Sequence, residues 1–211
     1  MYCKINNIKS SSYFENSIIY LAYDLNRDQL KLSADYQFLK VKKDLFILTR
    51  VALQNCLKMV DQTTNWPIDK IEIQNHQHLL GHQHVLSSIS HTKNLGIALI
   101  DCTQKYLSVG IDIEYKNRPL DPSSKKYFIN HMDKTEYNYL SIWTIKEAAY
   151  KAIWPLRHIY YENQKILLKH IWINDNQEFG LIGQSDILGH FTSSIIEANK
   201  KDIILSMAYL K

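Results

Sequence analysis

The chain has 211 residues and a formal net charge of +4; hydrophobic residues make up 45% of it and charged residues 22%. This balance is typical of a globular protein of one domain or two small ones, and it argues against intrinsic disorder. The net charge is too small to indicate nucleic-acid binding. It suits anionic partners such as a nucleotide-like cofactor or an acidic protein.

The cysteines and the N-terminal segment indicate the compartment. Cys3, Cys56 and Cys102 have neither the paired nor the metal-type spacing of cysteine motifs, which predicts small buried thiols in a reducing environment. The apolar run at 18–23 is too short for a signal-peptide core or a membrane span. We therefore expect a cytoplasmic protein that does not associate with membranes.

The first half of the chain predicts a long helix. Apolar residues recur at steps of three and four over 33–60, which is the period of an amphipathic helix. Lys42, Lys43 and Arg50 fall largely off this apolar stripe. They are candidates for contact with an anion, and the alternative is a solvated helix face.

Short strands are predicted after this helix. Segment 70–74 alternates briefly, and segment 96–101 is an apolar run bounded by polar residues. The sequence SISHT at 88–92 lies just before the second of these strands. Its small hydroxyls and its histidine predict a phosphate-binding turn that uses backbone N–H groups.

A clearly alternating strand is predicted over 107–115, and it contains the sequence GIDIE at 110–114. Residues two apart on a strand share a face, so Asp112 and Glu114 point the same way while Ile111 and Ile113 face the core. Adjacent carboxylates repel each other unless a cation lies between them or water screens them. They indicate either a site for a hard divalent cation or an edge strand with a solvated acidic face.

Two helices are predicted next, a short one over 122–130 and a stronger one over 141–153 that a proline closes. Trp143, Glu147 and Lys151 are spaced by four, so they line one face of the second helix. This face is a candidate functional surface. The alternative is a routine glutamate–lysine pair on a solvated helix.

The remainder of the chain predicts strands over 165–173, 179–183, 191–197 and 202–209, with a hairpin loop at 198–201. Each half of the chain therefore contains one main helix and a small, mostly antiparallel sheet. The fold class that follows is α+β.

Three blocks in this order resemble the 4′-phosphopantetheinyl transferase superfamily, in particular the monomeric type that activates peptide and polyketide synthetases. The blocks are SISHT, GIDIE and the sequence WTIKEAAYKA at 143–152. The last two match the family's diagnostic patterns Gly-x-Asp-x-Glu and Trp-Ser/Thr-x-Lys-Glu-Ala-x-x-Lys. The resemblance covers roughly half of the chain. It implies two similar α+β halves in a pseudo-twofold arrangement, with coenzyme A between them. We place the coenzyme-contacting half at 1–103 and the half with the metal site and catalytic helix at 104–211.

The resemblance also implies an activity. Members of the family transfer the 4′-phosphopantetheine moiety of coenzyme A to a serine hydroxyl of an apo acyl or peptidyl carrier protein, as in nonribosomal peptide synthesis, and release 3′,5′-ADP. Asp112, Glu114 and Glu147 would bind Mg²⁺, with Mn²⁺ as an alternative ion. Glu147 is the preferred base for the serine proton, and a metal-bound water is the alternative. Lys151 would hold the diphosphate and the departing 3′,5′-ADP.

The resemblance further implies contacts with coenzyme A. The matching positions are Ser90, His91 and Lys151, together with the basic residues Lys42, Lys43 and Arg50. The chain departs from the family at 75–77, where Asn-His-Gln replaces Gly-Lys/Arg-Pro. It departs again at 154–157, where Trp-Pro-Leu-Arg replaces a glycine-rich segment.

Other functions remain open at this point. A cluster of His76, His78, His82 and His84 predicts either a metal-binding protein or a solvated, pH-sensitive loop. A non-catalytic carrier-protein-binding protein with the same fold is a second alternative. Another Mg²⁺-dependent phosphotransferase is a third, although the sequence contains no Gly-rich phosphate loop.

Overall fold

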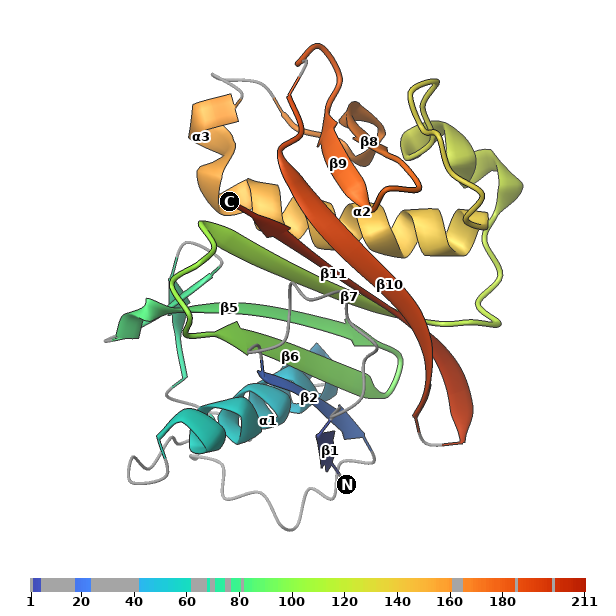
Figure 1. Ribbon diagram of the computed structural model, residues 1–211. Helices are drawn as coiled ribbons and strands as arrows, with labels where there is room; N and C mark the ends of the chain where they lie inside the picture. The colour runs from blue at the N-terminus through green and yellow to red at the C-terminus, as the bar shows by residue number, and fades with distance from the viewer. Residues whose placement is uncertain are drawn as a thin grey trace.

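The computed structural model describes residues 2–4, 18–23, 42–61, 68, 71–74, 77–80, 82–160, 165–184, 186–198 and 200–211. Within these residues the chain forms an α+β fold with two antiparallel sheets and one long helix on each sheet (Figure 1). The predicted fold class is confirmed at this level.

The first sheet is six-stranded in the described part of the chain, with the order β1-β2-β6-β5-β4-β3. Helix α1 (Lys42–Val60) packs against β2, β5 and β6. The strands are β1 (Tyr2–Lys4), β2 (Ile18–Tyr23), β3 (Ile73–Gln74), β4 (His78–Leu79), β5 (His82–Thr92) and β6 (Leu95–Asp101).

The second sheet is five-stranded in the described part of the chain, with the order β7-β11-β10-β9-β8. Its strands are β7 (Ser108–Tyr115), β8 (Ile171–Ile173), β9 (Glu178–Leu181), β10 (Gly189–Ala198) and β11 (Lys201–Leu210). Helix α2 (Tyr139–Ile153) packs against β7 and β11. The shorter helical elements are η4 (Pro122–Tyr127), η5 (Trp154–Leu156), α3 (Arg157–Tyr160) and η6 (Leu168–His170).

The two sheets share one connectivity. In each of them the strand that precedes the long helix pairs antiparallel with the last strand of the sheet, β2 with β6 and β7 with β11. The three strands that lie between the long helix and this last strand in the chain follow the last strand in the sheet, in reverse chain order. Apart from β1, the described strands and long helices therefore follow the same order twice along the chain.

Apolar residues form buried clusters on both sides of each sheet. One cluster lies between the sheets, where residues of β6 meet residues of β7 and β11; it includes Leu95, Ile97, Leu99, Ile111, Ile113, Leu205 and Met207. A second cluster joins α2 to the other face of its sheet, and a third joins α1 to the other face of the first sheet. The helices therefore lie on the outer sides, with the two sheets between them (Figure 1).

A glycine allows α2 to approach β7 closely. A methyl group built on Gly110 would lie 2.0 Å from the carbonyl oxygen of Ala148 and 2.8 Å from the backbone nitrogen of Ala152. These are backbone atoms in the C-terminal half of α2, so they cannot move aside without shifting the helix. Only glycine fits at this point of contact.

Most elements predicted in the second half of the chain are confirmed: the strand at 107–115, the helix at 141–153 and the hairpin around 198–201 match β7, α2 and the β10–β11 turn. Helix α2 begins where the Asn138 side chain accepts a hydrogen bond of 3.0 Å from the backbone N–H of Ser141. The strand predicted over 165–173 is wrong in its first part, since η6 precedes a short β8.

The predictions for the first half hold less well. The helix predicted over 33–60 is confirmed from Lys42, and its earlier part lies outside the described residues. The phosphate-binding turn predicted at 88–92 is wrong, because this segment belongs to the long strand β5. In the described part of the chain no helix is both long and apolar enough to cross a membrane.

Gly110→Ala should lower the free energy of unfolding by about 3 kcal/mol, the upper end of the range for overpacked cores, because the added methyl group meets helix backbone. Gly180→Ala is the matched control in the same sheet. There the two closest atoms, at 2.5 and 2.6 Å, belong to the side chain of Trp172. The third, the carbonyl oxygen of Asp186 at 2.8 Å, lies in a loop and moves more easily than helix backbone. We expect a loss of about 1 kcal/mol for the control. Urea unfolding checks both values, and equal losses would contradict the close contact.

Candidate active site

The two acidic residues of β7 are buried. Asp112 and Glu114 are only 6% and 7% exposed. Ile111 and Ile113 lie on the opposite face of the strand, in the cluster between the sheets. The predicted sharing of faces is therefore confirmed, and the alternative of a solvated acidic face is wrong.

Hydroxyl groups of β5 hold these two carboxylates. The Ser90 hydroxyl donates a hydrogen bond of 2.6 Å to Asp112 Oδ1, and the Thr92 hydroxyl donates one of 2.8 Å to Glu114 Oε2. The Ser88 hydroxyl oxygen accepts a bond of 3.0 Å from the backbone N–H of Ile111. These β5 residues are two apart and so share one face of the strand. Strand β5 thus lies along the free edge of β7 through side chains and not through a backbone ladder.

Two cations neutralise the buried carboxylates. Lys151 of α2 places its ammonium 2.7 Å from Asp112 Oδ1 and 3.0 Å from the carbonyl oxygen of Ile111. Arg118 forms an ion pair with Glu114. Burying an unpaired carboxylate is costly, so these ion pairs offset part of that cost. The alternative of a routine glutamate–lysine surface pair is wrong, because Lys151 reaches across to β7.

The acid of helix α2 lies near the acids of the strand. Glu147 is half-buried, and its pKa is raised above the ordinary value, first by burial and then by the negative charge of Asp112. The positive charges of Lys151 and Arg118 oppose this rise. Three predicted site residues, Asp112, Glu147 and Lys151, therefore interact electrostatically at the contact between β7 and α2.

His91 lies at the border of this cluster. The residue is exposed, yet partial burial of its ring lowers the pKa, and the positive charge of Lys151 lowers it further. The negative charge of Asp112 acts in the opposite direction. His91 is therefore within electrostatic range of both residues and favours its neutral form.

No group of three or more histidine, cysteine, aspartate or glutamate side chains in the described ranges is arranged to hold a metal ion. Lys151 and Arg118 contact the carboxylates of Asp112 and Glu114 instead. The magnesium site of Asp112, Glu114 and Glu147 stays a prediction. Its donor chemistry is nevertheless that of a hard cation, since all three side chains offer carboxylate oxygens.

A cavity of about 380 Å³ adjoins Lys151 and is lined by Ser88, Ile89, Tyr150, Lys151 and Trp154. It lies where β5 meets the C-terminal end of α2. The rings of Tyr150 and Trp154 are 5.3 Å apart at an angle of 33°. Sequence reasoning did not select either aromatic residue, although the departure from the family pattern at 154–157 pointed to this segment.

Of the three basic residues predicted on α1, the structure describes the side chain of Arg50 alone. The side chains of Lys42 and Lys43 lie outside what the structure describes. The Arg50 guanidinium lies 4.6 Å from the centre of the Phe46 ring on the same helix. Their contact with coenzyme A stays a prediction.

Lys146, the neighbour of Glu147, is fully buried. Its ammonium lies 2.7 Å from Asp133 Oδ2 and 2.7 Å from the carbonyl oxygen of Phe128. Asp133 also accepts hydrogen bonds from the backbone N–H groups of Asn130 and Ile173. Through Asp133, Lys146 therefore connects α2 to the preceding loop and to β8, which is a structural role.

The histidine cluster gains no support from the described residues. The rings of His82 and His84 are 6.0 Å apart, and His78 contacts the Gln77 amide. His76 lies outside the described residues. The described histidines are spread over β4 and the start of β5, and they do not form a metal-binding group.

A scan against models of protein families found none for this chain, and a search of curated proteins found no significant relative.

Glu147→Gln should change how stability depends on pH. Because the pKa of Glu147 is raised in the folded protein, the folded state binds a proton more tightly than the unfolded chain. The unfolding free energy of the wild type therefore falls as pH rises from the ordinary value of 4.5 through the raised pKa. Glutamine does not titrate, so the unfolding free energy of the variant lacks this decrease. We therefore expect the variant to be more stable, relative to the wild type, at neutral pH than near the ordinary carboxyl pKa.

Urea unfolding of both proteins, near the ordinary carboxyl pKa and again at neutral pH, measures this difference. The exposed Glu72 provides the control Glu72→Gln, which should follow the wild type. A Glu147→Gln variant whose stability parallels the wild type at both pH values would show that this carboxylate is not strained.

Proposed function

We propose that this protein transfers the 4′-phosphopantetheine moiety of coenzyme A to a serine hydroxyl of an apo carrier protein and releases 3′,5′-ADP. The single observation that carries the proposal is the ion pair of Lys151 with Asp112 between β7 and α2, with Glu147 of the same helix within electrostatic range of both residues. These residues come from the two sequence blocks that resemble the phosphopantetheinyl transferases. Their proximity is what a shared chemical role requires.

The shared connectivity of the two sheets also supports the proposal. The resembled family has two similar halves in a pseudo-twofold arrangement. A repeated order of strand, helix and four further strands is the topology that such an arrangement needs. We therefore propose the phosphopantetheinyl transferase fold for this chain, with its division near residue 103.

The carboxylates suit a magnesium ion. Asp112, Glu114 and Glu147 would hold it, since their oxygens are hard donors. Mg²⁺ binds through one or two protein carboxylates together with substrate phosphates and water, so a closed set of three side chains is not required before the substrate binds. When bound, the ion supplies neutralisation of the charge that builds on the phosphate oxygens.

The remaining roles follow from the chemistry of the residues. The serine oxygen forms a bond to the phosphorus that carries the pantetheine, and the bond from this phosphorus to the diphosphate bridge breaks. The electron pair of that bond leaves with 3′,5′-ADP. Glu147 accepts the serine proton, since a carboxylate is a suitable general base when it lies within reach of the attacking hydroxyl. Lys151 moves from Asp112 to the diphosphate and balances its charge.

The cavity beside Lys151 would take the nucleotide part of coenzyme A. Its volume of about 380 Å³ falls in the range of small-ligand pockets, roughly 300–1,000 Å³. Tyr150 and Trp154 offer aromatic faces on which a purine base stacks. Lys151, at the same wall, faces the phosphate end of such a ligand.

Asp112→Ala and Glu147→Ala should each abolish transfer, because each removes a carboxylate that the reaction uses. Intact-mass analysis of a panel of apo carrier proteins, incubated with coenzyme A and Mg²⁺, detects the added phosphopantetheine. The variant Glu72→Ala, at an exposed position, should act like the wild type. Circular dichroism verifies that each variant is folded.

Two outcomes would oppose the proposal in different ways. Full modification of a carrier by either site variant would exclude the proposed mechanism. Carrier binding by the wild type without any mass gain, across the whole panel, would instead favour a non-catalytic carrier-binding protein.

Trp154→Ala should raise the KM for coenzyme A about tenfold, because stacking of one base on an aromatic ring contributes roughly 1–3 kcal/mol. The variant Trp154→Phe keeps an aromatic face and should recover most of the affinity. The variant Ile159→Ala, at an exposed residue of α3, is the control. An unchanged KM in Trp154→Ala would place the base elsewhere.

A further inference from the structure

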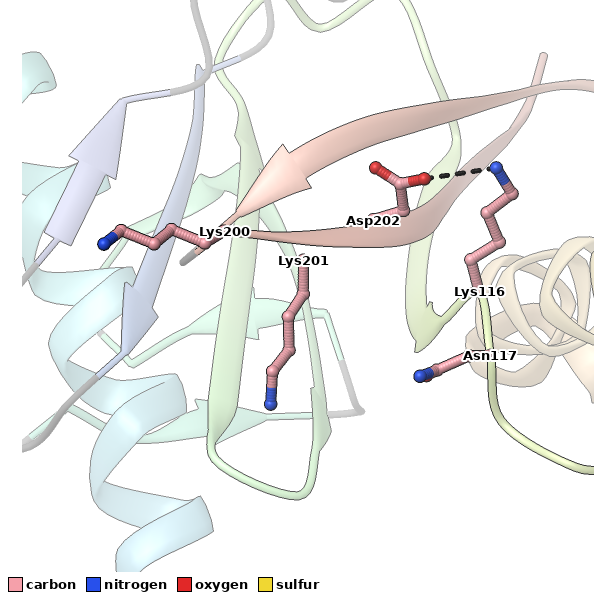
Figure 2. Close-up of a pocket in the computed structure, with 5 residues that line it drawn as sticks. All are labelled: Lys116, Asn117, Lys200, Lys201 and Asp202. Atoms are coloured by element: carbon pink, nitrogen blue, oxygen red, sulfur yellow. Dashed lines mark hydrogen bonds and ion pairs between the residues drawn. The ribbon is translucent and has the colours of Figure 1, made fainter.

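A second, larger cavity lies at the C-terminal end of β7. Its volume is about 600 Å³, and it is lined by Lys116, Asn117, Lys200, Lys201 and Asp202 (Figure 2). The first two residues follow β7, and the other three belong to the turn and the start of β11. Three ammonium groups and one carboxylate give this lining a formal charge of +2.

The carboxylate neutralises little of this charge. Lys116 Nζ lies 3.1 Å from Asp202 Oδ2, but both side chains are about half exposed, at 52% and 53%. Exposed ion pairs of this kind contribute little and are screened by salt. In Figure 2 the side chains of Lys201 and Asn117 extend to the same side of the hairpin, whereas Lys200 points away from the other four residues.

A further lysine extends this positive surface. Lys93 is in the turn between β5 and β6, and its ammonium lies 6.0 Å from the centre of the Tyr115 ring. The Lys201 ammonium lies 5.2 Å from the centre of the same ring. Two hairpin turns, one from each sheet, therefore bring lysines together around Tyr115. The surface is wider than a single phosphate would need.

This surface adjoins the candidate active site. Lys116 follows Glu114 by two residues, and Lys93 follows Thr92, whose hydroxyl donates to Glu114. The same ends of β5 and β7 thus carry the acidic cluster and the positive surface. A protein that presents a serine to Glu147 would extend over this end of the molecule.

We propose that the cavity lined by Lys116, Asn117, Lys200, Lys201 and Asp202 docks an acidic segment of the protein that carries the acceptor serine. The inference rests on the proposed function. Carboxylates of the partner would pair with Lys201 inside the cavity and with Lys200 at its rim, and the Asn117 amide would donate a hydrogen bond. The lysines are exposed and flexible, which favours an extended, solvated protein contact over a buried site for a small anion.

The test is the charge-reversal variant K200E/K201E, with steady-state kinetics on an acidic carrier that the wild type modifies. We expect the KM for the carrier to rise about fivefold or more, since two exposed pairs are lost and repulsion replaces them. The kcat and the KM for coenzyme A should stay within about twofold, because neither lysine contacts the acidic cluster.

The matched control is K58E/K105E, which changes the net charge equally. Lys58 is an exposed residue in the last turn of α1, and Lys105 is exposed in the segment before β7, at the other end of that strand. This control should keep the wild-type KM for the carrier. The salt dependence of that KM should weaken in K200E/K201E and not in the control.

The outcomes separate this inference from the proposed function. If the wild type modifies the carrier and K200E/K201E has an unchanged KM, the docking inference is wrong and the function stands. If the wild type modifies no carrier, the proposed function is wrong. In that case, binding of a labelled glutamate-rich peptide tests whether the cavity docks an acidic segment. Fluorescence anisotropy must show that the wild type and the control bind it more tightly than K200E/K201E, and equal binding would overturn the docking site.

Discussion

The contact between β5 and the free edge of β7 is the interaction on which the candidate site depends. Three hydroxyl residues on one face of β5, Ser88, Ser90 and Thr92, bond to β7 at Ile111, Asp112 and Glu114. Together with the apolar cluster between the sheets, these bonds set the position of the first sheet against the second. They also leave the two carboxylates buried and hydrogen-bonded, facing the helix that carries Glu147.

The arrangement stores electrostatic strain at one place. Glu147 is half-buried near the negative charge of Asp112, and its pKa is raised as a result. Lys151 relieves part of this repulsion by its contact with Asp112. A group that balances charge within the protein is also able to balance the charge of a bound diphosphate, so the cation that stabilises the free site suits the handling of substrate. Sites that are costly to the fold are often functional.

Close packing fixes the position of α2 relative to β7 and so keeps the charged residues of the site close together. Gly110 allows the α2 backbone to approach β7, and the buried ion pair of Lys146 and Asp133 ties the same helix to the loop before it and to β8. Removing either partner of such a pair leaves an uncompensated charge, so the pair strongly favours one position of α2. The glycine and the lysine thus act on the placement of Glu147 without sharing its proposed chemistry.

Local periodicity in the sequence determined β7, α2, the shared face of Asp112 and Glu114, and the alignment of Glu147 with Lys151, because these features depend only on repeats of two and of about four residues. Tertiary structure decided the rest. The polar residues at 88–92 predicted a turn, whereas in the structure they belong to β5 and their hydroxyl groups face β7. The partner of Lys151 is on a strand 39 residues away in the chain. Only the packed helix shows that Lys146 is buried and pairs with Asp133. Hydrogen bonds and charges between distant segments carry no local pattern, so only the folded chain reveals which groups they join.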